Sequence, residues 1–124
     1  MNIIFDTHSF LWALSEPVRL TAPQRVELET PANAVWLSAI SVAEIAIKAS
    51  LGKLVVNIDI LEAARDSGFE ILEYGAEDAL PLKELPFHHR DPFERMIVSQ
   101  AMTRDYVIMT SNKKFEQYPA RLVR

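Results

Sequence analysis

The stretch Asn2-Ile-Ile-Phe-Asp-Thr-His-Ser-Phe-Leu-Trp-Ala-Leu14 begins with a short apolar run and continues with apolar residues three or four positions apart. The run over residues 2–5 predicts a buried strand, and the spacing of Phe10, Leu11 and Leu14 predicts a helix directly after it. Asp6 lies where one pattern changes into the other. The stretch therefore predicts a strand-to-helix unit with an acid at its junction.

The same alternation of strand and helix continues along the rest of the chain. Further strands are expected over residues 35–38, 69–74, 106–110 and 121–123. Helices are expected over 21–29, 41–52, 58–67, 76–85 and 92–104, with a helical turn over 112–118. Strands that alternate with helices form βαβ units, so we predict an α/β protein with a mainly parallel central sheet of four or five strands flanked by helices.

Several of the expected helices carry signals at their ends. Thr21 is a plausible N-cap with a proline following in the first turn, and Asp91 precedes Pro92 in the same way. Gly52 suits the end of a helix. Pro81 is expected to interrupt the helix over 76–85.

Length and composition limit the class of protein. The 124 residues fit one domain, expected over residues 1–124, and the 49% hydrophobic content supplies its core. The chain starts without a basic segment and meets a charge at Asp6, and no apolar run approaches the roughly 20 residues that a membrane span needs. We therefore expect a cytoplasmic protein.

Charge and cysteine content restrict the ligands. Cysteine is absent, so disulfides and thiolate metal sites are excluded, and any metal must be held by oxygen. The formal net charge of −4 argues against a broad basic face for nucleic acid. A local basic patch remains compatible with it, because a divalent cation in an acidic pocket changes the charge that a phosphate meets.

Acidic residues follow the predicted strands. Asp6 ends the first strand, and Glu44 lies one turn into the helix after the second. Asp91 and Glu94 open the long helix, and Asn112 follows the fourth strand. The carboxyl ends of parallel strands face one way, and ligands bind at that edge of the sheet. We therefore expect these side chains to meet there.

Each acid also has a purely structural interpretation. Asp6 and Asp91 stand at N-cap positions, and Glu94 in a first helical turn suits the helix dipole. Ser41-x-x-Glu44 has the pattern of a capping box. For each residue taken singly, capping remains an open alternative to a role in a site.

As a group, the acids favour a metal site. Several carboxylates within a few ångströms of one another repel unless a cation holds them. Mg²⁺ and Mn²⁺ prefer carboxylate and water oxygens to soft donors. The sequence therefore predicts a pocket for a divalent metal that is lined by oxygen atoms.

Four segments resemble the PIN-domain toxins of bacterial VapBC toxin–antitoxin pairs. They are Ile4-Phe-Asp-Thr-His-Ser-Phe-Leu-Trp12, Ser41-Val-Ala-Glu-Ile-Ala-Ile-Lys48 with Leu51-Gly-Lys53, His89-Arg-Asp-Pro-Phe-Glu-Arg-Met-Ile97, and Thr110-Ser-Asn-Lys-Lys-Phe115. The resemblance runs nearly from end to end. It implies a PIN-like three-layer α/β fold and a metal-dependent endoribonuclease that uses Mg²⁺ or Mn²⁺, is blocked by a cognate antitoxin, and is commonly a homodimer.

The resemblance also implies roles for single residues. Asp6, Glu44, Asp91 and Glu94 match the family's acidic positions, which makes them the expected catalytic and metal-binding residues. Asp6 and Asp91 are the expected direct ligands, and Glu44 is a ligand or orients the attacking water. Glu94 stands where the family most often has aspartate. Asn112 stands where the family usually has an acid, and as a ligand it offers only a neutral carbonyl oxygen, which implies a weak second metal.

Basic residues flank the same junctions, namely Lys48, Arg90, Arg95, Lys113 and Lys114. Arg90 and Lys113 are the leading candidates for contact with phosphates of an RNA substrate. The other three are expected on an ordinary solvated helix surface.

Histidines and aromatic residues near the site have structural expectations. His88 and His89 are expected on the surface of a loop rather than as a general base. Apolar residues at helical spacing usually belong to the core or to a dimer interface. That is the expectation for Phe10, Trp12, Phe93 and Tyr106.

Two other functions stay open. One is a non-catalytic module that binds RNA or an antitoxin while Asn112 impairs catalysis. The other is a phosphoryl-transfer enzyme or phospho-acceptor domain in which Asp6 is the nucleophile at a metal site. Metal-dependent cleavage of RNA would separate the nuclease from the first, and a stable acyl-phosphate would reveal the second.

Overall fold

Five strands form one sheet in the order β3-β2-β1-β4-β5 in the computed structural model, which describes residues 1–88 and 90–124. Every pairing in that sheet is parallel, which confirms the mainly parallel sheet predicted from the sequence. The predicted strands over 69–74 and 106–110 are shorter in the structure. The strands are β1 (Asn2–Phe5), β2 (Ala34–Ser38), β3 (Glu70–Leu72), β4 (Val107–Met109) and β5 (Leu122–Val123).

β1 is the central strand, because it pairs with β2 on one side and with β4 on the other. Ile4 is in register with Trp36 of β2 and with Ile108 of β4. In an open α/β sheet, ligands bind at the carboxyl ends of the strands, at the point where the order of the strands reverses direction. Asp6 follows β1 directly and lies at that point.

Helices cover both faces of the sheet. They are α1 (Thr7–Ser15), α2 (Ala22–Glu29), α3 (Ala39–Ser50), α4 (Ile60–Asp66), α5 (Ala76–Ala79) and α6 (Pro92–Arg104). None of the helices formed by residues 1–88 and 90–124 has the length and apolar content of a membrane span.

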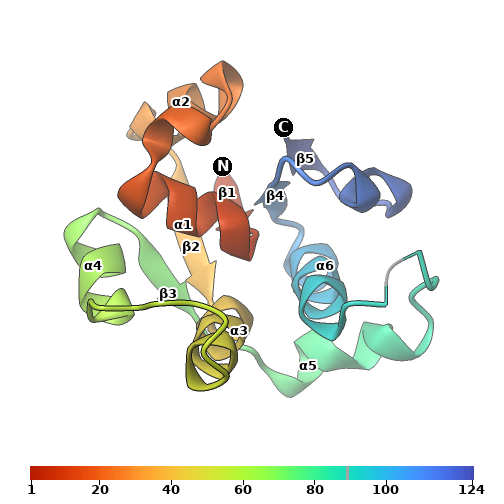
Figure 1. Cartoon of the computed structure of the whole chain (residues 1–124). Helices are drawn as coiled ribbons and strands as arrows, with labels where there is room; N and C mark the ends of the chain where they lie inside the picture. Colours follow the sequence, from red (N-terminus) through yellow and green to blue (C-terminus); the bar gives the residue numbers. More distant parts are fainter. Residues whose placement is uncertain (89) are drawn as a thin grey trace.

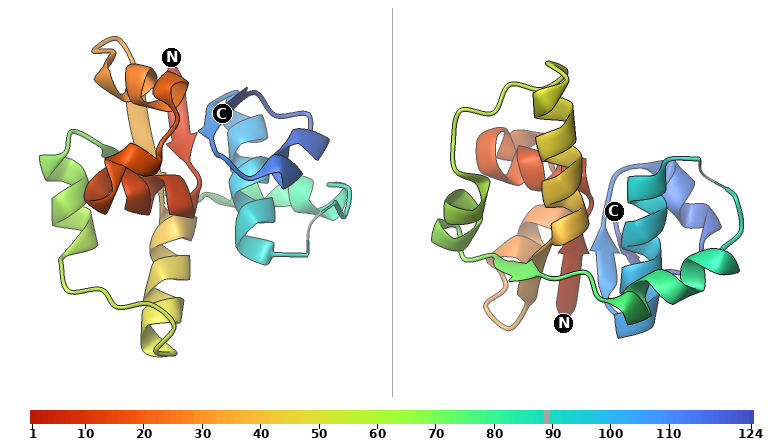
Figure 2. Two further views of the ribbon diagram at one scale, coloured as in Figure 1. Left: turned by 45° about the horizontal axis from the view of Figure 1, so that its top comes forward. Right: turned by 90° about the horizontal axis from the view of Figure 1, so that it is seen from below.

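Two cores, one on each face, follow from the alternation of side chains along β1. Ile3 and Phe5 pack with residues of α1, α3 and α4. Ile4 packs on the opposite face with residues of α6 and of the segment after α5. Figures 1 and 2 show α4 and α6 apart from each other with strands between them. The expected three-layer arrangement is confirmed.

Most of the predicted helix ends are confirmed. Asp6, Thr21 and Asp91 each accept a hydrogen bond from a backbone amide in the first turn of α1, α2 and α6. Gly52 has a φ of +70° just beyond the end of α3, a conformation that glycine adopts without steric cost.

The start of α3 differs from the prediction. Its N-cap is Ser38, whose Oγ accepts from the amide of Ile40 at 3.1 Å, and the helix begins at Ala39 rather than Ser41. Ser41 and Glu44 are buried inside the helix, so the capping box suggested for them is wrong. Because the last residue of β2 already supplies the cap, the side chain of Glu44 is available for other contacts.

Three short 3₁₀ segments join the regular elements. η1 (Pro17–Arg19) has no counterpart in the prediction. η2 (Leu80–Lys83) replaces the second half of the helix expected over 76–85, because Pro81 cannot donate the next helical hydrogen bond. η3 (Lys113–Gln117) is the predicted helical turn.

A buried glutamine of α6 joins the ends of two strands. Oε1 of Gln100 accepts from Ser38 Oγ at the end of β2, at 2.7 Å. Its Nε2 donates to the carbonyl of Glu73 just after β3, at 2.9 Å, and to Oδ2 of Asp78 at 3.1 Å. These hydrogen bonds fix the position of α6 relative to β2 and β3.

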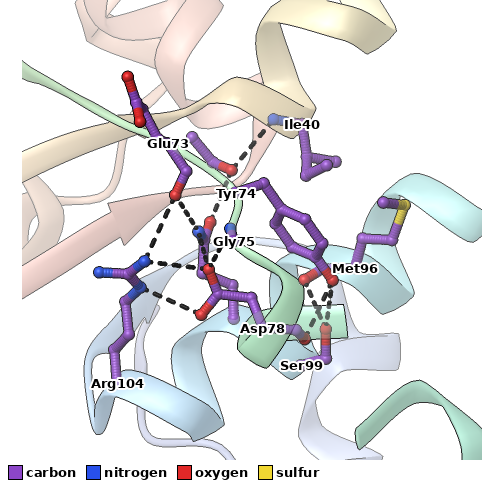
Figure 3. A network of polar contacts seen from close by, with 10 residues as sticks. Ile40, Glu73, Tyr74, Gly75, Asp78, Met96, Ser99 and Arg104 are labelled. Carbon is purple, nitrogen blue, oxygen red and sulfur yellow. Dashed lines mark hydrogen bonds and ion pairs between the residues drawn. The ribbon is translucent and has the colours of Figure 1, made fainter. Parts of the chain in front are cut away.

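Asp78 is the second centre of this network. It is buried and accepts from the Gly75 amide at 2.8 Å and from Arg104 NH2 at 3.0 Å, as Figure 3 shows. Burial by itself raises the pKa of Asp78, but the hydrogen bonds from Arg104, the Gly75 amide and Gln100 outweigh it, and the pKa lies below its usual value.

Replacing Asp78 by alanine should lower the free energy of unfolding by about 3 kcal/mol at pH 7, because Gln100 and Arg104 lose their acceptor. Since the folded pKa is depressed, this stabilisation is present above the unfolded pKa of about 3.8 and is lost as the pH falls through the folded value. Urea denaturation at pH 7 and at acid pH measures both effects. Glu77→Ala, an exposed acid of the same helix, is the control; an equal loss in both variants would contradict the assignment.

Candidate functional site

Asp6 lies between the carboxyl ends of β1 and β4. Its Oδ1 accepts from the amide of Ser9 at 2.7 Å, and its Oδ2 accepts from the hydroxyl of Thr110, just after β4. Only 6% of the residue is exposed. Asp6 is thus both the cap of α1 and a fixed carboxylate at the centre of the sheet edge.

Glu44 reaches the same edge from α3. Only 4% of it is exposed, and both of its oxygens are engaged. The hydroxyl of Thr7 donates to Oε1 at 2.7 Å and lies 2.9 Å from Ser41 Oγ. Lys48 Nζ lies 2.6 Å from Oε2. Thr7, the residue that follows Asp6, therefore links the Glu44 carboxylate on α3 to the start of α1.

Asp91 is the N-cap of α6, and Glu94 lies in the first turn of that helix. Oδ1 of Asp91 accepts from the amides of Phe93 and Glu94, at 2.9 and 3.3 Å. The half-buried carboxylate of Glu94 accepts from Nδ2 of Asn112 at 3.2 Å. A hydrogen bond thus joins the start of α6 to the segment that follows β4.

A small cavity joins three of the predicted acids. It has a volume of about 10 Å³, roughly the space of one water molecule or ion. Its lining includes Asp6, Glu44 and Glu94. Asp91 does not line it, although the negative charge of Asp91 acts on Glu94. The structure therefore brings all four acids to one place, with Asp91 outside the cavity.

The charges of these acids act on one another. Burial, followed by the negative charges of Asp91, Asp6 and Glu44, raises the pKa of Glu94 to about 7. The hydrogen bond to Glu44, assisted by the negative charges of Glu44, Asp91 and Glu94, raises the pKa of Lys48. At neutral pH the cluster therefore favours the binding of a proton or another cation.

A divalent metal ion fits the chemistry of this donor set. The cavity is lined by carboxylate oxygens, which Mg²⁺ and Mn²⁺ prefer. Among residues 1–88 and 90–124, no three acidic or histidine side chains already stand together as a metal-ligand set. Instead, Thr7, Lys48 and Thr110 hold the carboxylate oxygens. Coordination of a metal ion would therefore require these side chains to rotate.

Asn112 has its two polar atoms turned in opposite directions. Its Oδ1 accepts from the amide of Lys114 at 3.0 Å and caps η3, so its Nδ2 faces Glu94. The amide hydrogen, rather than the expected carbonyl oxygen, is thus presented to the acids. Ligation of a metal by Asn112 stays a prediction that requires the amide to turn.

The basic residues divide into two groups. Arg90 and Lys113 are exposed next to the acidic cluster in the sequence, which is compatible with phosphate contact. Arg95 is 6% exposed and donates to the carbonyls of Leu85 and Pro86, at 3.0 and 2.8 Å, so its expected place on a solvated surface is wrong. It holds the loop before α6, a role that charge alone did not reveal.

The histidines and aromatic residues can also be placed. His88 is exposed, as expected, and its ring lies 5.1 Å from that of Tyr118. The expectation for His89 falls outside the described residues. Phe10 is fully buried, and Phe93 and Tyr106 pack against the core, which confirms their predicted places.

Trp12 does not have the expected place in a core. It lines a cleft of about 470 Å³ beside the acids, together with Asp6, His8, Arg19, Ser111 and Asn112. The place of Arg19 in this cleft was not predicted from the sequence, because no regular element was expected around it. The only available signal for Trp12 was its position one helical turn after His8, on the same face.

In the metal-free wild-type protein, the free energy of unfolding should fall as the pH rises. Replacing Glu94 by glutamine should remove this fall. The pKa of Glu94 is about 7 in the folded protein, above its usual value of 4.5. The contribution of protonated Glu94 to stability is therefore fully present below about pH 4.5 and is lost as the pH rises through 7. At pH 8 the variant should be about 2 kcal/mol more stable than wild type, with allowance for partial exposure.

Thermal denaturation in EDTA between pH 4 and 8 measures this effect. Glu29→Gln, an exposed acid of α2, is the matched control and should follow the wild-type curve. Parallel curves for wild type and Glu94→Gln would show that Glu94 is not under the proposed repulsion.

Comparison with known proteins finds the same fold in solved structures. No curated protein matches the chain. Solved structures with the same fold include VapBC2 from Rickettsia felis bound to a DNA fragment from their promoter, with a TM-score of 0.74, 20% identity, and coverage of 98% of this chain and 97% of that one. DNA-bound VapBC from Salmonella typhimurium has a TM-score of 0.73 and 20% identity, with 98% and 96% covered.

VapBC-1 from nontypeable Haemophilus influenzae is a further structure with this fold, with a TM-score of 0.63, 17% identity, and 98% and 96% of the two chains covered. Residues 3–121 match the family described as the PIN domain. Because that match takes in nearly the whole described fold, from β1 to the residue before β5, the chain belongs to the PIN domain family.

Proposed function

We propose that the chain is a metal-dependent endoribonuclease, the toxin of a type II toxin–antitoxin pair, which hydrolyses RNA phosphodiester bonds in the cytoplasm. The observation that carries the proposal is the convergence of Asp6, Glu44, Asp91 and Glu94, three of which line one cavity. Burial and the charges of the other three acids raise the pKa of Glu94 to about 7. Such a cluster is costly unless it binds a cation. Membership of the PIN domain family supports nuclease chemistry.

The residues of the chain position the reacting groups. Asp6 and Asp91 are the proposed metal ligands, and each has one oxygen fixed by a backbone amide. Glu44, held by Thr7 and Lys48, is a ligand or orients the attacking water. These residues would hold Mg²⁺ or Mn²⁺, which when bound would supply a water molecule of lowered pKa and a Lewis acid for the scissile phosphate.

The proposed substrate contacts lie outside the acidic cavity. Arg90 and Lys113 are exposed on either side of Asp91 and Glu94 in the sequence, one before α6 and one after β4. Lys114 acts on Glu94 and lowers its pKa, so positive charge reaches the cluster from η3. We assign Arg90 and Lys113 to the RNA phosphates, because cations at the rim offset the repulsion between phosphates and acids.

We assign a cognate antitoxin as the protein partner. The solved neighbours are VapBC complexes, and this chain offers an apolar groove of about 210 Å³ between α1 and residues 54–60. Val55 and Ile58 of that groove are 81% and 57% exposed. Exposed apolar surface of this kind suits a protein partner. A basic antitoxin side chain would also suit the acidic cluster, and we propose that the toxin is a homodimer.

Cleavage of a panel of structured and single-stranded RNAs by antitoxin-free protein tests the nuclease. We expect cutting with Mg²⁺ or Mn²⁺, none with EDTA, and a loss of about 100-fold or more in Asp6→Ala, because one proposed ligand is removed. Asp66→Ala, an exposed acid of α4, should cut like wild type. Cutting that persists in EDTA or in Asp6→Ala would rule out this site.

A second candidate function is a catalytically impaired module that binds RNA or an antitoxin. The arrangement of Asn112 favours it, because the amide hydrogen rather than an oxygen faces Glu94. The impaired module and the active nuclease predict different effects of a carboxylate at position 112 on RNA cleavage.

Asn112→Asp should increase the affinity for Mn²⁺ about tenfold or more, since it adds a negative charge beside Glu94. Aspartate caps a helix as well as asparagine does, so η3 should be retained. Calorimetric titration and the cleavage assay measure the change, with Asn57→Asp, an exposed position, as the charge-matched control. Activity that appears only in Asn112→Asp supports the impaired module, and unchanged affinity and activity would contradict a metal near residue 112.

A further inference from the structure

The cleft beside the acids has the size and lining of a ligand site. Its volume of about 470 Å³ falls in the usual range for small-ligand pockets. An aromatic ring, a guanidinium, a hydroxyl and an amide all face it. The residues that line it are Asp6, His8, Trp12, Arg19, Ser111 and Asn112.

One wall of this cleft is an aromatic surface with a cation above it. His8 and Trp12 lie one turn apart on α1, with ring centroids 6.3 Å apart and planes inclined by 31°. The guanidinium carbon of Arg19, from η1, lies 4.6 Å from the centre of the Trp12 ring. Flat rings and guanidinium groups are the surfaces on which unpaired bases stack.

The cation is held loosely. The side chain of Arg19 is 54% exposed, and its nearest charged partner, Glu16, is 3.6 Å away and 58% exposed. An exposed ion pair of this kind contributes little to stability. Arg19 can therefore move from the tryptophan ring to a base or a phosphate at small cost.

The cleft adjoins the acidic cavity. Asp6 and His8 line both of them. Asn112 lines the cleft and also donates to Glu94, which lines the cavity. A polymer with one phosphate at the acids would therefore place an adjoining residue in the cleft.

We propose that this cleft binds one unpaired nucleotide of the RNA substrate, next to the phosphodiester at the acids. The base stacks on Trp12, and Arg19 contacts the base or its phosphate. The amide of Asn112 and the hydroxyl of Ser111 lie at the edge of the site, where they can meet the polar edge of a base or a 2′-hydroxyl. The inference rests on the proposed nuclease function and adds to it a preference for single-stranded RNA, because a paired base cannot lie against the ring.

Binding in EDTA tests this subsite without any cleavage. A fluorescently labelled single-stranded RNA of mixed sequence is titrated at low ionic strength, with a perfect RNA duplex for comparison. Trp12→Ala should weaken binding of the single strand by about fivefold or more, and Trp12→Phe should keep most of the affinity. Trp36→Phe, which changes the other tryptophan, should bind like wild type. Equal affinity of wild type and Trp12→Ala would overturn the inference.

A second measurement keeps Trp12 in place. In a Trp36→Phe background, Trp12 is the only tryptophan, and stacking of a base should quench its emission when single-stranded RNA is added. Duplex RNA should leave the emission nearly unchanged. A signal that does not respond to the single strand would overturn the subsite, even if Trp12→Ala proved unstable.

The outcomes separate the subsite from the nuclease. Binding that depends on Trp12, without cleavage in Mn²⁺, would keep the subsite and overturn the nuclease. Loss of cleavage in Asp6→Ala would support the nuclease. If Trp12→Ala then had the same KM for RNA as wild type, the nuclease would stand and the subsite would be overturned. A merely structural contact between Arg19 and Trp12 would change thermal stability in Trp12→Ala but leave its RNA affinity unaltered.

Discussion

Repulsion among the carboxylates of Asp6, Glu44, Asp91 and Glu94 is the constraint to which the surrounding structure responds. Parallel pairing brings these acids to one edge of the sheet, where burial strengthens their interaction. Helix amides stabilise Asp6 and Asp91, and a hydroxyl and an ammonium stabilise Glu44. Burial, followed by this repulsion, raises the pKa of Glu94 to about 7. The result is a site that favours the binding of a cation.

The relative positions of these acids depend on hydrogen bonds outside the site. Ser38 caps α3, which carries Glu44, and the same hydroxyl donates to Gln100 of α6, which carries Glu94. Asp78 continues this link through Gln100 and Arg104 toward the end of β3. One buried hydroxyl thus contacts both of the helices that supply glutamates to the cavity.

The distribution of charge at the sheet edge explains how a chain of net charge −4 could bind RNA. Acids are concentrated in a small cavity, whereas the arginine and the tryptophan ring of the adjoining cleft face outward. Backbone phosphates and bases would then meet different surfaces. Under the proposed function, the acids provide the metal site and the cleft provides the affinity for an unpaired base.

The sequence by itself determined the order of the elements, the parallel sheet and the acids at its edge, because apolar periodicity and capping residues are local signals. Only the tertiary structure decided that Ser38 rather than Ser41 begins α3, that Arg95 is buried against backbone carbonyls, and that Asn112 turns its nitrogen to Glu94. It also brought Trp12 and Arg19 together over a cleft. Some of these features depend on contacts with residues distant in the sequence. Others depend on which of two possible partners a side chain contacts, and local sequence patterns do not determine that choice.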